Sequence, residues 1–393
     1  MPDFRFSLPQ ITALTDDQQV AYYPRTSILV SGGPGSGKTV VTIYRFLRAV
    51  LEENNIMLFT FNNALMYAIK GTLRARSEEL FGELDEGKIN TVIDEQLGTF
   101  FQWHKDNIGY YDANADHEIA KANFTRYYDK YGRLDELFFD EGQDLPRTVY
   151  GNAFVLSDTV SVGADRAQNY QGYYGDDEAE DEIYGQLKKI KADTDWQILA
   201  SNFRNTREIF ELAQKFVPED PRVQRMKTDQ LRRGNTPDIR IGLNQADQLD
   251  LILKIIEANQ ASNIGILVHF ANEIPTIKDF LERKGYSCAA DAAPDKSFSY
   301  YSHRIQPQDE TVLMDRVSSP FITTFDSCKG LEFDVVIMPF FEESPAATRK
   351  RTKSGRVYVT PNHYYVAVTR ARNEIYILSA NQPPSLSFHT AAN

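Results

Sequence analysis

The chain has 393 residues, about twice to three times the usual length of one domain, so the sequence predicts two domains, at residues 1–196 and 197–393. Hydrophobic residues make up 42% of the chain and charged residues 25%, values that exclude a disordered or fibrous protein. The formal net charge of −12 excludes general adhesion to nucleic acid or anionic lipid, although an acidic body can still carry a local basic groove.

No run of residues approaches the roughly 18 to 20 apolar positions needed to cross a bilayer. The start of the chain lacks the basic and apolar regions of a secretory signal. Two cysteines, Cys288 and Cys328, are too few for a disulfide framework and lack the paired spacing of a zinc site. We therefore expect a cytoplasmic protein whose thiols pack in the interior.

Short aliphatic runs alternate with longer helical patterns along the chain. This alternation predicts an α/β fold, in which parallel sheets are covered by helices on both faces. Residues 77–130 are predicted to form a mostly helical insert in the first domain. The strand-like runs are Ser27–Val30, Ile56–Phe61, Leu137–Phe139, Val160–Val162, Ile264–Val268, Val335–Met338 and Ile375–Leu378.

The first of these runs leads into a glycine-rich loop that fills every fixed position of the G-x-x-x-x-G-K-[ST] pattern. In such a loop, backbone N–H groups and the N-terminus of the following helix surround phosphate oxygens. Lys38 would reach the outer phosphates, and the Thr39 hydroxyl would ligate Mg²⁺. The predicted nucleotide-binding residues of the loop are Gly32, Gly33, Pro34, Gly35, Ser36, Gly37, Lys38 and Thr39.

Two acidic residues, Asp140 and Glu141, directly follow the apolar run Leu137–Phe139. Asp140 would hold Mg²⁺, directly or through water, and Glu141 would orient and deprotonate the attacking water. Adjacent carboxylates after an apolar strand are common by chance, but the phosphate-binding loop upstream gives this pair its meaning. Together, the two motifs predict an ATPase.

Further motifs resemble, in order, those of superfamily 1 helicases of the UvrD/Rep/PcrA type. Residues 14–19 resemble the Q motif, which implies that Gln18 hydrogen-bonds the adenine edge. Residues 140–144 resemble the DExQD box. Residues 165–170 resemble motif III, whose glutamine, here Gln168, senses the γ-phosphate. The resemblance implies two RecA-like domains with ATP in the cleft between them.

The second half of the chain continues the resemblance. Residues 202–206 are similar to motif IV, which implies that Phe203 stacks on adenine and that Arg204 touches the γ-phosphate. Residues 324–333 resemble motif V, whose glutamate, Glu332, contacts the ribose.

Motif VI is resembled by residues 368–372, in which Arg370 would be the second arginine finger. An arginine placed across a cleft accelerates phosphoryl transfer by roughly 10³ to 10⁵, but only when the two halves close. Arg204 and Arg370 come from one half, whereas the phosphate loop comes from the other. Hydrolysis would therefore open and close the two domains and drive steps along a strand.

The nucleic-acid face resembles the family in part. Residues 60–62 match motif Ia, which implies that Thr60 and Asn62 bond phosphate or sugar and that Phe61 contacts a base. Tyr170, followed by two more tyrosines at 173 and 174, stands where the family carries a base-stacking aromatic residue. Thr324, at the start of motif V, is assigned to the same face.

Several positions depart from the family pattern. Motif Ib should carry a T-F-H-type run, but the nearest stretch, residues 91–95, places Asp94 where a strand-facing polar group is expected. Motif V has Asp326 in place of its usual histidine, and motif III has Ala164 in place of its first glycine. Because a carboxylate repels phosphate, we expect weak nucleic-acid binding or a need for a partner.

The accessory domains of larger family members are expected to be reduced, because the interval from Arg204 to Thr324 leaves room for little beyond a second core domain. Unwinding in the family relies on those domains, so translocation is a firmer expectation than strand separation. The basic run at residues 349–356 would grip duplex or a protein partner, or would be a solvated loop.

The leading hypothesis is an ATP- and Mg²⁺-dependent helicase or translocase moving 3′→5′ on single-stranded DNA, with RNA as an alternative strand. A second hypothesis is a partner-dependent regulatory ATPase, such as the helicase-like subunit of an antiviral nuclease system of the Gabija kind. The short frame, Asp94 and Asp326 support it. A third class, a P-loop kinase or GTPase, gives no reason for Gln18, Phe203 and Arg204 to occur in this order.

Overall fold

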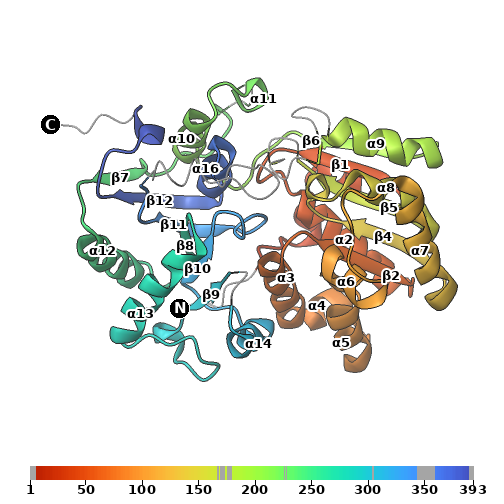
Figure 1. Ribbon diagram of the computed structural model, residues 1–393, viewed down its shortest axis with the longest axis horizontal. Helices are drawn as coiled ribbons and strands as arrows, with labels where there is room; N and C mark the ends of the chain where they lie inside the picture. Colours follow the sequence, from red (N-terminus) through yellow and green to blue (C-terminus); the bar gives the residue numbers. More distant parts are fainter. Residues whose placement is uncertain are drawn as a thin grey trace. The chain divides into compact units, whose positions relative to one another are not determined.

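Two six-stranded sheets, each made of parallel strands, form the framework of the protein in the computed structural model (Figure 1). The structure describes residues 6–165, 168, 173–174, 179–224, 226, 228–302, 305–342 and 359–388. The chain divides into a first unit, Ser7–Phe203, and a second unit, Arg204–Asn393 together with Phe6. Each unit contains one of the sheets, with helices on both of its faces, and the predicted α/β fold class is confirmed.

The sheet of the first unit has the strand order β3-β2-β4-β5-β1-β6, and every neighbouring pair is parallel. Parallel strands covered on both faces often appear in sequence as continuous apolar runs, as in Ile56–Phe59 of β2 and Leu137–Phe139 of β4. The strands are β1 Ile28–Gly32, β2 Ile56–Thr60, β3 Leu97–Thr99, β4 Leu134–Phe139, β5 Ser157–Ala164 and β6 Asp195–Leu199.

Polar side chains at the N-termini begin several helices of this unit. Thr15, Asn62, Asp85 and Asp116 each accept a hydrogen bond from a backbone N–H of the first helical turn. The helices are α1 Asp16–Tyr22, α2 Lys38–Leu51, α3 Asn63–Ala75, α4 Ser77–Phe81, α5 Glu86–Glu95, α6 Phe100–Asn107, α7 His117–Tyr131, α8 Arg147–Leu156 and α9 Ala179–Ile190.

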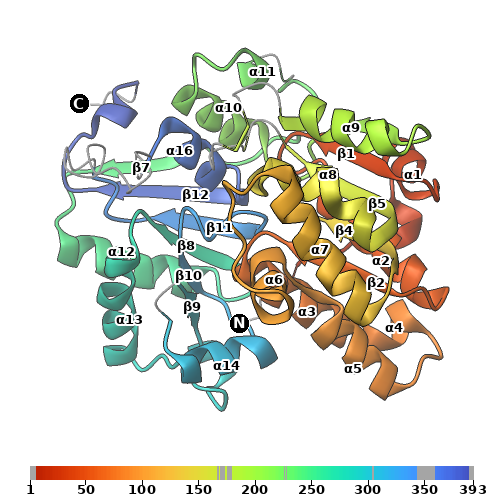
Figure 2. The ribbon, with the colours of Figure 1, turned by 45° about the vertical axis from the view of Figure 1, so that its right-hand side comes forward.

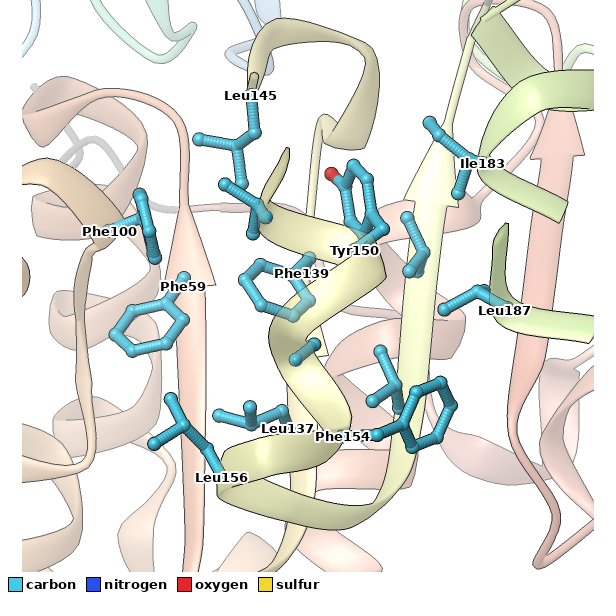
Figure 3. Packing of buried hydrophobic residues seen from close by; sticks show 14 of the residues in the cluster. Phe59, Phe100, Leu137, Phe139, Leu145, Tyr150, Phe154, Leu156, Ile183 and Leu187 are labelled. Atoms are coloured by element: carbon cyan, nitrogen blue, oxygen red, sulfur yellow. The ribbon is translucent and has the colours of Figure 1, made fainter. Parts of the chain in front are cut away.

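The core of the first unit is thick with aromatic rings. On one face of the sheet, α8 lays Tyr150, Phe154 and Leu156 over Leu137 and Phe139 (Figure 3). The Phe139 ring lies 5.5 Å from that of Tyr150 and 5.6 Å from that of Phe59, measured between centroids. This packing fixes the end of β4, the strand that carries Asp140.

The segment predicted as a helical insert, residues 77–130, is mostly helical but is also part of the sheet. It forms α4 and α5, then β3, and then α6 and most of α7. The strand β3 pairs with β2, and Thr99 lies opposite Thr60 in the register. A three-residue strand has too few positions to show a periodic pattern, so β3 was not predicted from sequence.

The sheet of the second unit has the order β7-β12-β11-β8-β10-β9 and is also parallel throughout. Helices α12 and α13 lie on one face of this sheet, and α10 and α16 lie on the other (Figure 2). Isoleucines of α12 and α13 belong to the buried cluster of this unit, and α10 packs against α16. The strands are β7 Asp238–Ile241, β8 Ile264–Val268, β9 Ser299–Tyr301, β10 Phe321–Thr324, β11 Phe333–Met338 and β12 Ala371–Ser379. The helices are α10 Arg207–Phe216, α11 Pro221–Gln224, α12 Gln245–Ala258, α13 Ile274–Arg283, α14 Pro307–Asp315 and α16 Pro361–Val368.

All seven predicted strand-like runs overlap strands of the structure. Five further strands, β3, β6, β7, β9 and β10, were not predicted, because each is short or carries polar residues. Both cysteines are free; Cys328 is buried and Cys288 is half-buried. Across the described part of the chain, no helix combines the length and the apolar character that a membrane span requires.

Candidate active site

The predicted phosphate and metal residues lie at one edge of the first sheet, because β1, β4 and β5 are adjacent and parallel. The loop after β1 carries Lys38, and the ends of β4 and β5 carry Asp140 and Asp165. Ligands in open α/β sheets bind at this carboxyl edge. A Cβ atom on Gly163 would lie 3.1 Å from Asp140 Oδ1, so a larger residue there would crowd that carboxylate.

The glycine loop makes close contacts that only glycine allows. Gly37, with a φ of 91°, precedes α2 in the left-handed region. A Cβ atom on Gly37 would lie 2.3 Å from Gln18 Nε2, and one on Gly32 would lie 2.5 Å from Leu199 O. The buried hydroxyl of Ser36 has no hydrogen-bond partner among the described residues. A phosphate oxygen would satisfy it, so the loop fits the predicted ligand.

The ammonium group of Lys38 is held inside this loop. Its Nζ donates to Gly32 O at 2.8 Å and to Gly33 O at 3.0 Å, and it lies 3.4 Å from Asp165 Oδ2. Lys38 is buried. A phosphate would therefore exchange existing partners of this cation rather than capture it from solvent.

Asp140 lies at the place expected of a metal ligand. Its Oδ2 accepts a hydrogen bond from Thr39 Oγ1 at 2.9 Å. Burial, and then the neighbouring Glu141 carboxylate, raise the pKa of Asp140 to about 7. A hydroxyl and a carboxylate in a buried place are hard oxygen donors of the kind that Mg²⁺ prefers. The two residues therefore fit the predicted ion.

Glu141 is held in a strained conformation beside Asp140. It is buried and has a φ of 56° in the left-handed region, which costs about 1–2 kcal/mol for a residue other than glycine. Its Oε2 accepts from Gln143 Nε2 at 2.7 Å. Strain of this kind occurs at sites where geometry matters more than local stability.

A chain of hydrogen bonds joins the phosphate loop to the other motifs of this edge. Asp165 Oδ2, the partner of Lys38, accepts from Gln168 Nε2 at 2.5 Å. The Asp165 N–H in turn donates to Gln143 Oε1 at 2.9 Å. Asp165 and Gln143 were not among the predicted site residues, although both lie inside motifs that the sequence displays. Lys38 is therefore linked to Glu141 through the side chain and backbone N–H of Asp165 and the side chain of Gln143.

Two predicted adenine-binding residues are tied to the same loop. Gln18 Nε2 donates to Ser36 O at 3.0 Å, and Gln18 Oε1 accepts from Thr15 N at 3.1 Å. The Phe203 N–H donates to Gly35 O at 2.9 Å, and the Phe203 side chain is exposed. Gln18 and Phe203 therefore both stand beside the glycine loop, as a base-binding pair requires.

The second unit brings Arg204 to Glu332, which were both predicted to contact nucleotide. Arg204 Nε lies 3.0 Å from Glu332 Oε2, and Arg372 Nη1 lies 3.4 Å from Glu332 Oε1. Asn205 Nδ2 donates to Thr369 O and Ala371 O at 3.1 and 2.6 Å. Motifs IV, V and VI thus meet around one carboxylate.

Arg370 lies in the interior of this unit. It is 1% exposed and donates to Val366 O at 2.9 Å, Leu331 O at 3.3 Å and Thr369 Oγ1 at 3.2 Å. The guanidinium group is therefore fixed by its own unit. A role as arginine finger stays a prediction for this residue.

Residues of motif Ia lie where β2 ends. The Thr60 hydroxyl donates to Asn62 O at 3.3 Å, and Asn62 Oδ1 accepts from Leu65 N at 2.8 Å. Asn62 is therefore the N-cap of α3. Phe61 is partly exposed beside them. In the second unit, Thr324 closes a turn by accepting from Ser327 N at 3.2 Å.

Two domain families match the chain. Residues 14–273 match the UvrD/REP helicase N-terminal domain, and residues 303–382 match the UvrD-like helicase C-terminal domain. The chain belongs to the UvrD/REP helicase family. The P-loop ATPase and DNA-helicase class predicted from the motifs is thereby confirmed.

Individual relatives are more distant. The RecBCD enzyme subunit RecB of Chlamydia pneumoniae is 41% identical over 70 residues, which are 18% of this chain and 6% of that protein. The chain thus matches a small part of that relative's length.

Two solved structures share the helicase description. The C-terminal domain of a protein described as a possible DNA helicase from Lactobacillus plantarum is 15% identical, with a TM-score of 0.32, over 49% of this chain and 96% of that one. The PRRSV helicase is 14% identical, with a TM-score of 0.37, over 90% of this chain and 52% of that one.

The stretch that lies nearest to the motif Ib pattern in sequence is part of a helix. Residues 91–95 belong to α5, and Asp94 forms ion pairs with Arg74 and Lys70 rather than facing a strand path alone. The strand next to β2 ends instead at Thr99, followed by Phe100. Thr99 and Phe100 therefore form a T-F pair beside the end of β2, which the sequence analysis did not consider.

Asp326, the second unexpected acid, is also partnered. Its Oδ1 lies 3.1 Å from His363 Nε2. The Thr360 N–H donates to His363 Nδ1 at 3.0 Å, so Nε2 carries the proton and donates to Asp326. The side chain of Asp326 is 53% exposed. Its charge is therefore partly engaged by a histidine, which the sequence did not foresee.

The tyrosines after motif III differ from one another. Tyr170 lies outside the described residues, as does the basic run at 349–356. Tyr174 is buried in the core of the first unit, with the Arg147 guanidinium 5.6 Å from its ring centroid. Tyr173 is half-buried against the same core. Tyr174 therefore packs inside the helicase core and does not offer its ring to a base.

His269, at the end of β8, is a buried histidine whose ring nitrogens find no hydrogen-bond partner among the described residues. Burial, and then nearby His363, lower its pKa from 6.5 to about 4. As the pH falls, His269 therefore takes up a proton in the unfolded chain before it does so in the folded protein. The free energy of unfolding decreases as the pH falls from about 6.5 to about 4. Between pH 7 and pH 5 the loss from this group is about 2 kcal/mol.

The variant His269→Phe should remove most of that pH dependence. The ring would remain among Phe325, Phe341 and Tyr364, which surround it now. Urea unfolding at pH 7 and pH 5 measures the effect as a difference between the variant and the wild type. An unchanged difference between the two pH values would show that His269 does not titrate in this range.

Proposed function

We propose that the chain is an Mg²⁺- and ATP-dependent motor that moves 3′→5′ along single-stranded DNA. The observation that carries the proposal is the bonded path from Lys38 through Asp165 and Gln143 to Glu141, within a family of DNA helicases. It would link the phosphate-binding lysine to Glu141, the proposed base for the attacking water, through shared partners.

Nucleotide binding would use the groups that stand ready in the first unit. The glycine loop would wrap the phosphates, and Thr39 and Asp140 would hold Mg²⁺, which supplies charge neutralisation on the β- and γ-phosphate oxygens. Gln18 uses one amide N–H and one carbonyl lone pair on its described partners. The remaining N–H and lone pair match N7 and the N6 amino group of adenine.

Hydrolysis would depend on Glu141 taking a proton from the attacking water. Gln143, bonded to it at 2.7 Å, would fix the direction of the carboxylate. Arg204 and Arg370 of the second unit would complete the site when the units close over ATP. Glu332, which now binds Arg204, would then be free to contact the ribose, as the family resemblance implies.

Asp165 would couple nucleotide binding to motion along the strand. When phosphate oxygens bind Lys38, the Lys38 contact with Asp165 would weaken, and Gln168 would turn from Asp165 toward the γ-phosphate. The first unit would contribute Thr60, Phe61, Asn62 and the motif III tyrosine Tyr170 to DNA binding. The second unit would contribute Thr324. We add Thr99 to this face because it lies opposite Thr60 at the same sheet edge.

Thr99 offers a specific prediction. The variant Thr99→Val removes a hydroxyl while keeping the shape of the side chain, so the DNA concentration that gives half-maximal stimulation of ATP turnover should rise about tenfold. Turnover without DNA should stay at the wild-type level. Thr91→Val, which removes an exposed hydroxyl from α5, is the matched control. Equal DNA dependence of the two variants would remove Thr99 from the interface.

The proposal as a whole is tested by displacing streptavidin from biotin at either end of a DNA oligonucleotide at low salt. A motor moving 3′→5′ displaces it from the 5′ end in the presence of ATP and Mg²⁺. The proposal would be wrong if neither single-stranded DNA nor single-stranded RNA changed the rate of ATP turnover. Displacement only from the 3′ end would reverse the direction.

A second candidate function is that of an ATPase subunit within a larger assembly with a nuclease. The observation that favours it is the local match to RecB, a subunit of the RecBCD enzyme. The two unexpected acids give this function less support than the sequence suggested, because Asp94 and Asp326 have cationic or histidine partners. Purification from native cells with a stoichiometric nuclease would favour this function. A monomer that translocates alone would exclude it.

A further inference from the structure

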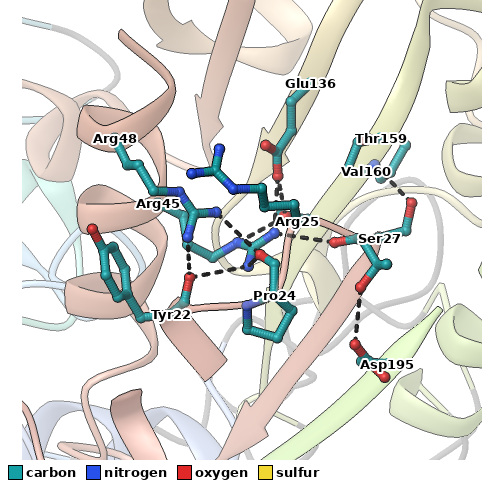
Figure 4. A network of polar contacts seen from close by, with 12 residues as sticks. Tyr22, Pro24, Arg25, Ser27, Arg45, Arg48, Glu136, Thr159, Val160 and Asp195 are labelled. Atoms are coloured by element: carbon teal, nitrogen blue, oxygen red, sulfur yellow. Dashed lines mark hydrogen bonds and ion pairs between the residues drawn. The ribbon is translucent and has the colours of Figure 1, made fainter. Parts of the chain in front are cut away.

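Arg45, on α2, is the centre of a polar network outside the phosphate site (Figure 4). It is 0% exposed and is among the largest fully buried side chains of the described residues. Its Nη1 donates to Ala21 O at 3.2 Å, Tyr22 O at 3.4 Å and Pro24 O at 2.5 Å. Its Nη2 and Nε donate to Thr26 O, Glu136 Oε1 and Ser161 Oγ at 3.1, 3.1 and 3.2 Å.

Most of these acceptors belong to the end of α1 and the segment that follows it. The last carbonyl groups of a helix have no partners within the helix and form the negative end of its dipole. The guanidinium group of Arg45 supplies both hydrogen bonds and a positive charge at that place. Arg48, one turn further along α2, adds donors to Tyr22 O at 2.6 Å and Tyr23 O at 3.2 Å.

The helix α1 needs this support because it cannot stand alone. It has seven residues, well below the length at which an isolated helix is stable in water. Its buried residues are Gln18 and Ala21, whereas Val20 is exposed and so is Tyr23 at its end. With so little apolar burial, the position of α1 depends on polar contacts at its two ends.

Gln18 is sensitive to any shift of α1. It lies on the first turns of the helix, and its Nε2 is 3.0 Å from Ser36 O and within reach of Gly37. Arg45 lies two turns after Lys38 on α2, about 10 Å along a rigid helix. The phosphate loop and the clamp on α1 are therefore mounted on one element, which fixes Gln18 relative to the phosphates.

Burying a charged side chain in a protein core costs free energy, because the charge loses its hydration. Burial lowers the pKa of Arg45, and the Glu136 carboxylate works against that shift. Apolar residues of similar size are often as stabilising as a buried ion pair, and in some proteins such a pair serves to fix one defined geometry. Here the defined geometry is the path of residues 21–26, between the Gln18 helix and β1.

We propose that Arg45 is a positioning residue for adenine selectivity, which holds α1 so that Gln18 meets the base at a fixed distance from the phosphate loop. The inference rests on the proposed role of Gln18 as the residue that reads adenine. It assigns nucleotide choice partly to a side chain that touches neither base nor phosphate.

The test compares ATP with GTP as substrates of the full chain. In Arg45→Lys, one amine replaces a planar fork of donors, so the ratio of kcat/KM for ATP to that for GTP should fall about tenfold, mainly through a higher KM for ATP. The turnover number should change little. Arg25→Lys, at an exposed arginine bonded to Glu52, is the matched control and should leave the ratio unchanged.

A double-mutant cycle with Gln18→Ala separates the possible results. If Arg45 acts through Gln18, then adding Arg45→Lys to Gln18→Ala should have little further effect on the ratio. Additive effects, or an Arg45→Lys ratio equal to wild type, would overturn the proposal. Should Gln18→Ala itself leave the ratio unchanged, the adenine-reading role fails first. If Arg45→Lys does not fold, Arg48→Ala loosens the same end of α1 and should lower the ratio in the same direction.

Discussion

Glu141→Gln is expected to lower the ATP turnover number by about 10³-fold while leaving nucleotide binding in place. The amide keeps the size of the carboxylate but cannot accept the proton of the attacking water. The phosphate loop, Thr39 and Asp140 are untouched, so the nucleotide and its ion keep their ligands. Phosphate release gives the turnover number, and calorimetry with ATP gives the dissociation constant.

The companion variant Lys38→Ala should abolish hydrolysis for a different reason. It removes the cation that Gly32 O and Gly33 O hold at the mouth of the loop, so ATP binding should be lost together with turnover. The pair separates chemistry from binding. Normal hydrolysis by Glu141→Gln would show that another group acts as the base.

Arg204→Ala should cost about 10³-fold or more in turnover number if this arginine stabilises the charge of phosphoryl transfer. KM for ATP should change far less, because the groups proposed to bind the phosphates and Mg²⁺ belong to the first unit. Glu332 would keep Arg372 as a partner, so the second unit should retain its fold. Arg240→Ala, in the same unit, removes an arginine whose described carboxylate partner is Asp238, and provides the control.

The measurement is single-turnover hydrolysis at saturating ATP, with and without DNA. A loss seen only in KM would place Arg204 in ground-state binding. Turnover equal to that of the Arg240→Ala control would remove it from the reaction altogether.

The sequence was most informative where a motif is continuous along the chain. The strands before the glycine loop and before the Asp140–Glu141 pair were both predicted, because each contains an apolar run that leads to the site. Short or polar strands were missed. Of these, β3 had the largest consequence, because its end, at Thr99, completes the edge that β2 begins.

Contacts between distant residues could not be predicted from one sequence. Lys38 and Asp165 are 127 positions apart, and Arg45 and Glu136 are 91 apart. Nothing in the local pattern of Asp94 says that Arg74 neutralises it across two helices. Such pairs are fixed by how helices pack on the sheet, and packing follows from the whole fold rather than from any motif.

The division of the chain falls between Phe203 and Arg204, inside a single motif. On one side, the Phe203 N–H is bonded to Gly35 O of the phosphate loop; on the other, Asn205 is bonded to Thr369 O and Ala371 O. Phe203 and Asn205 are separated by Arg204 alone. The main chain on either side of Arg204 is therefore anchored within its own unit.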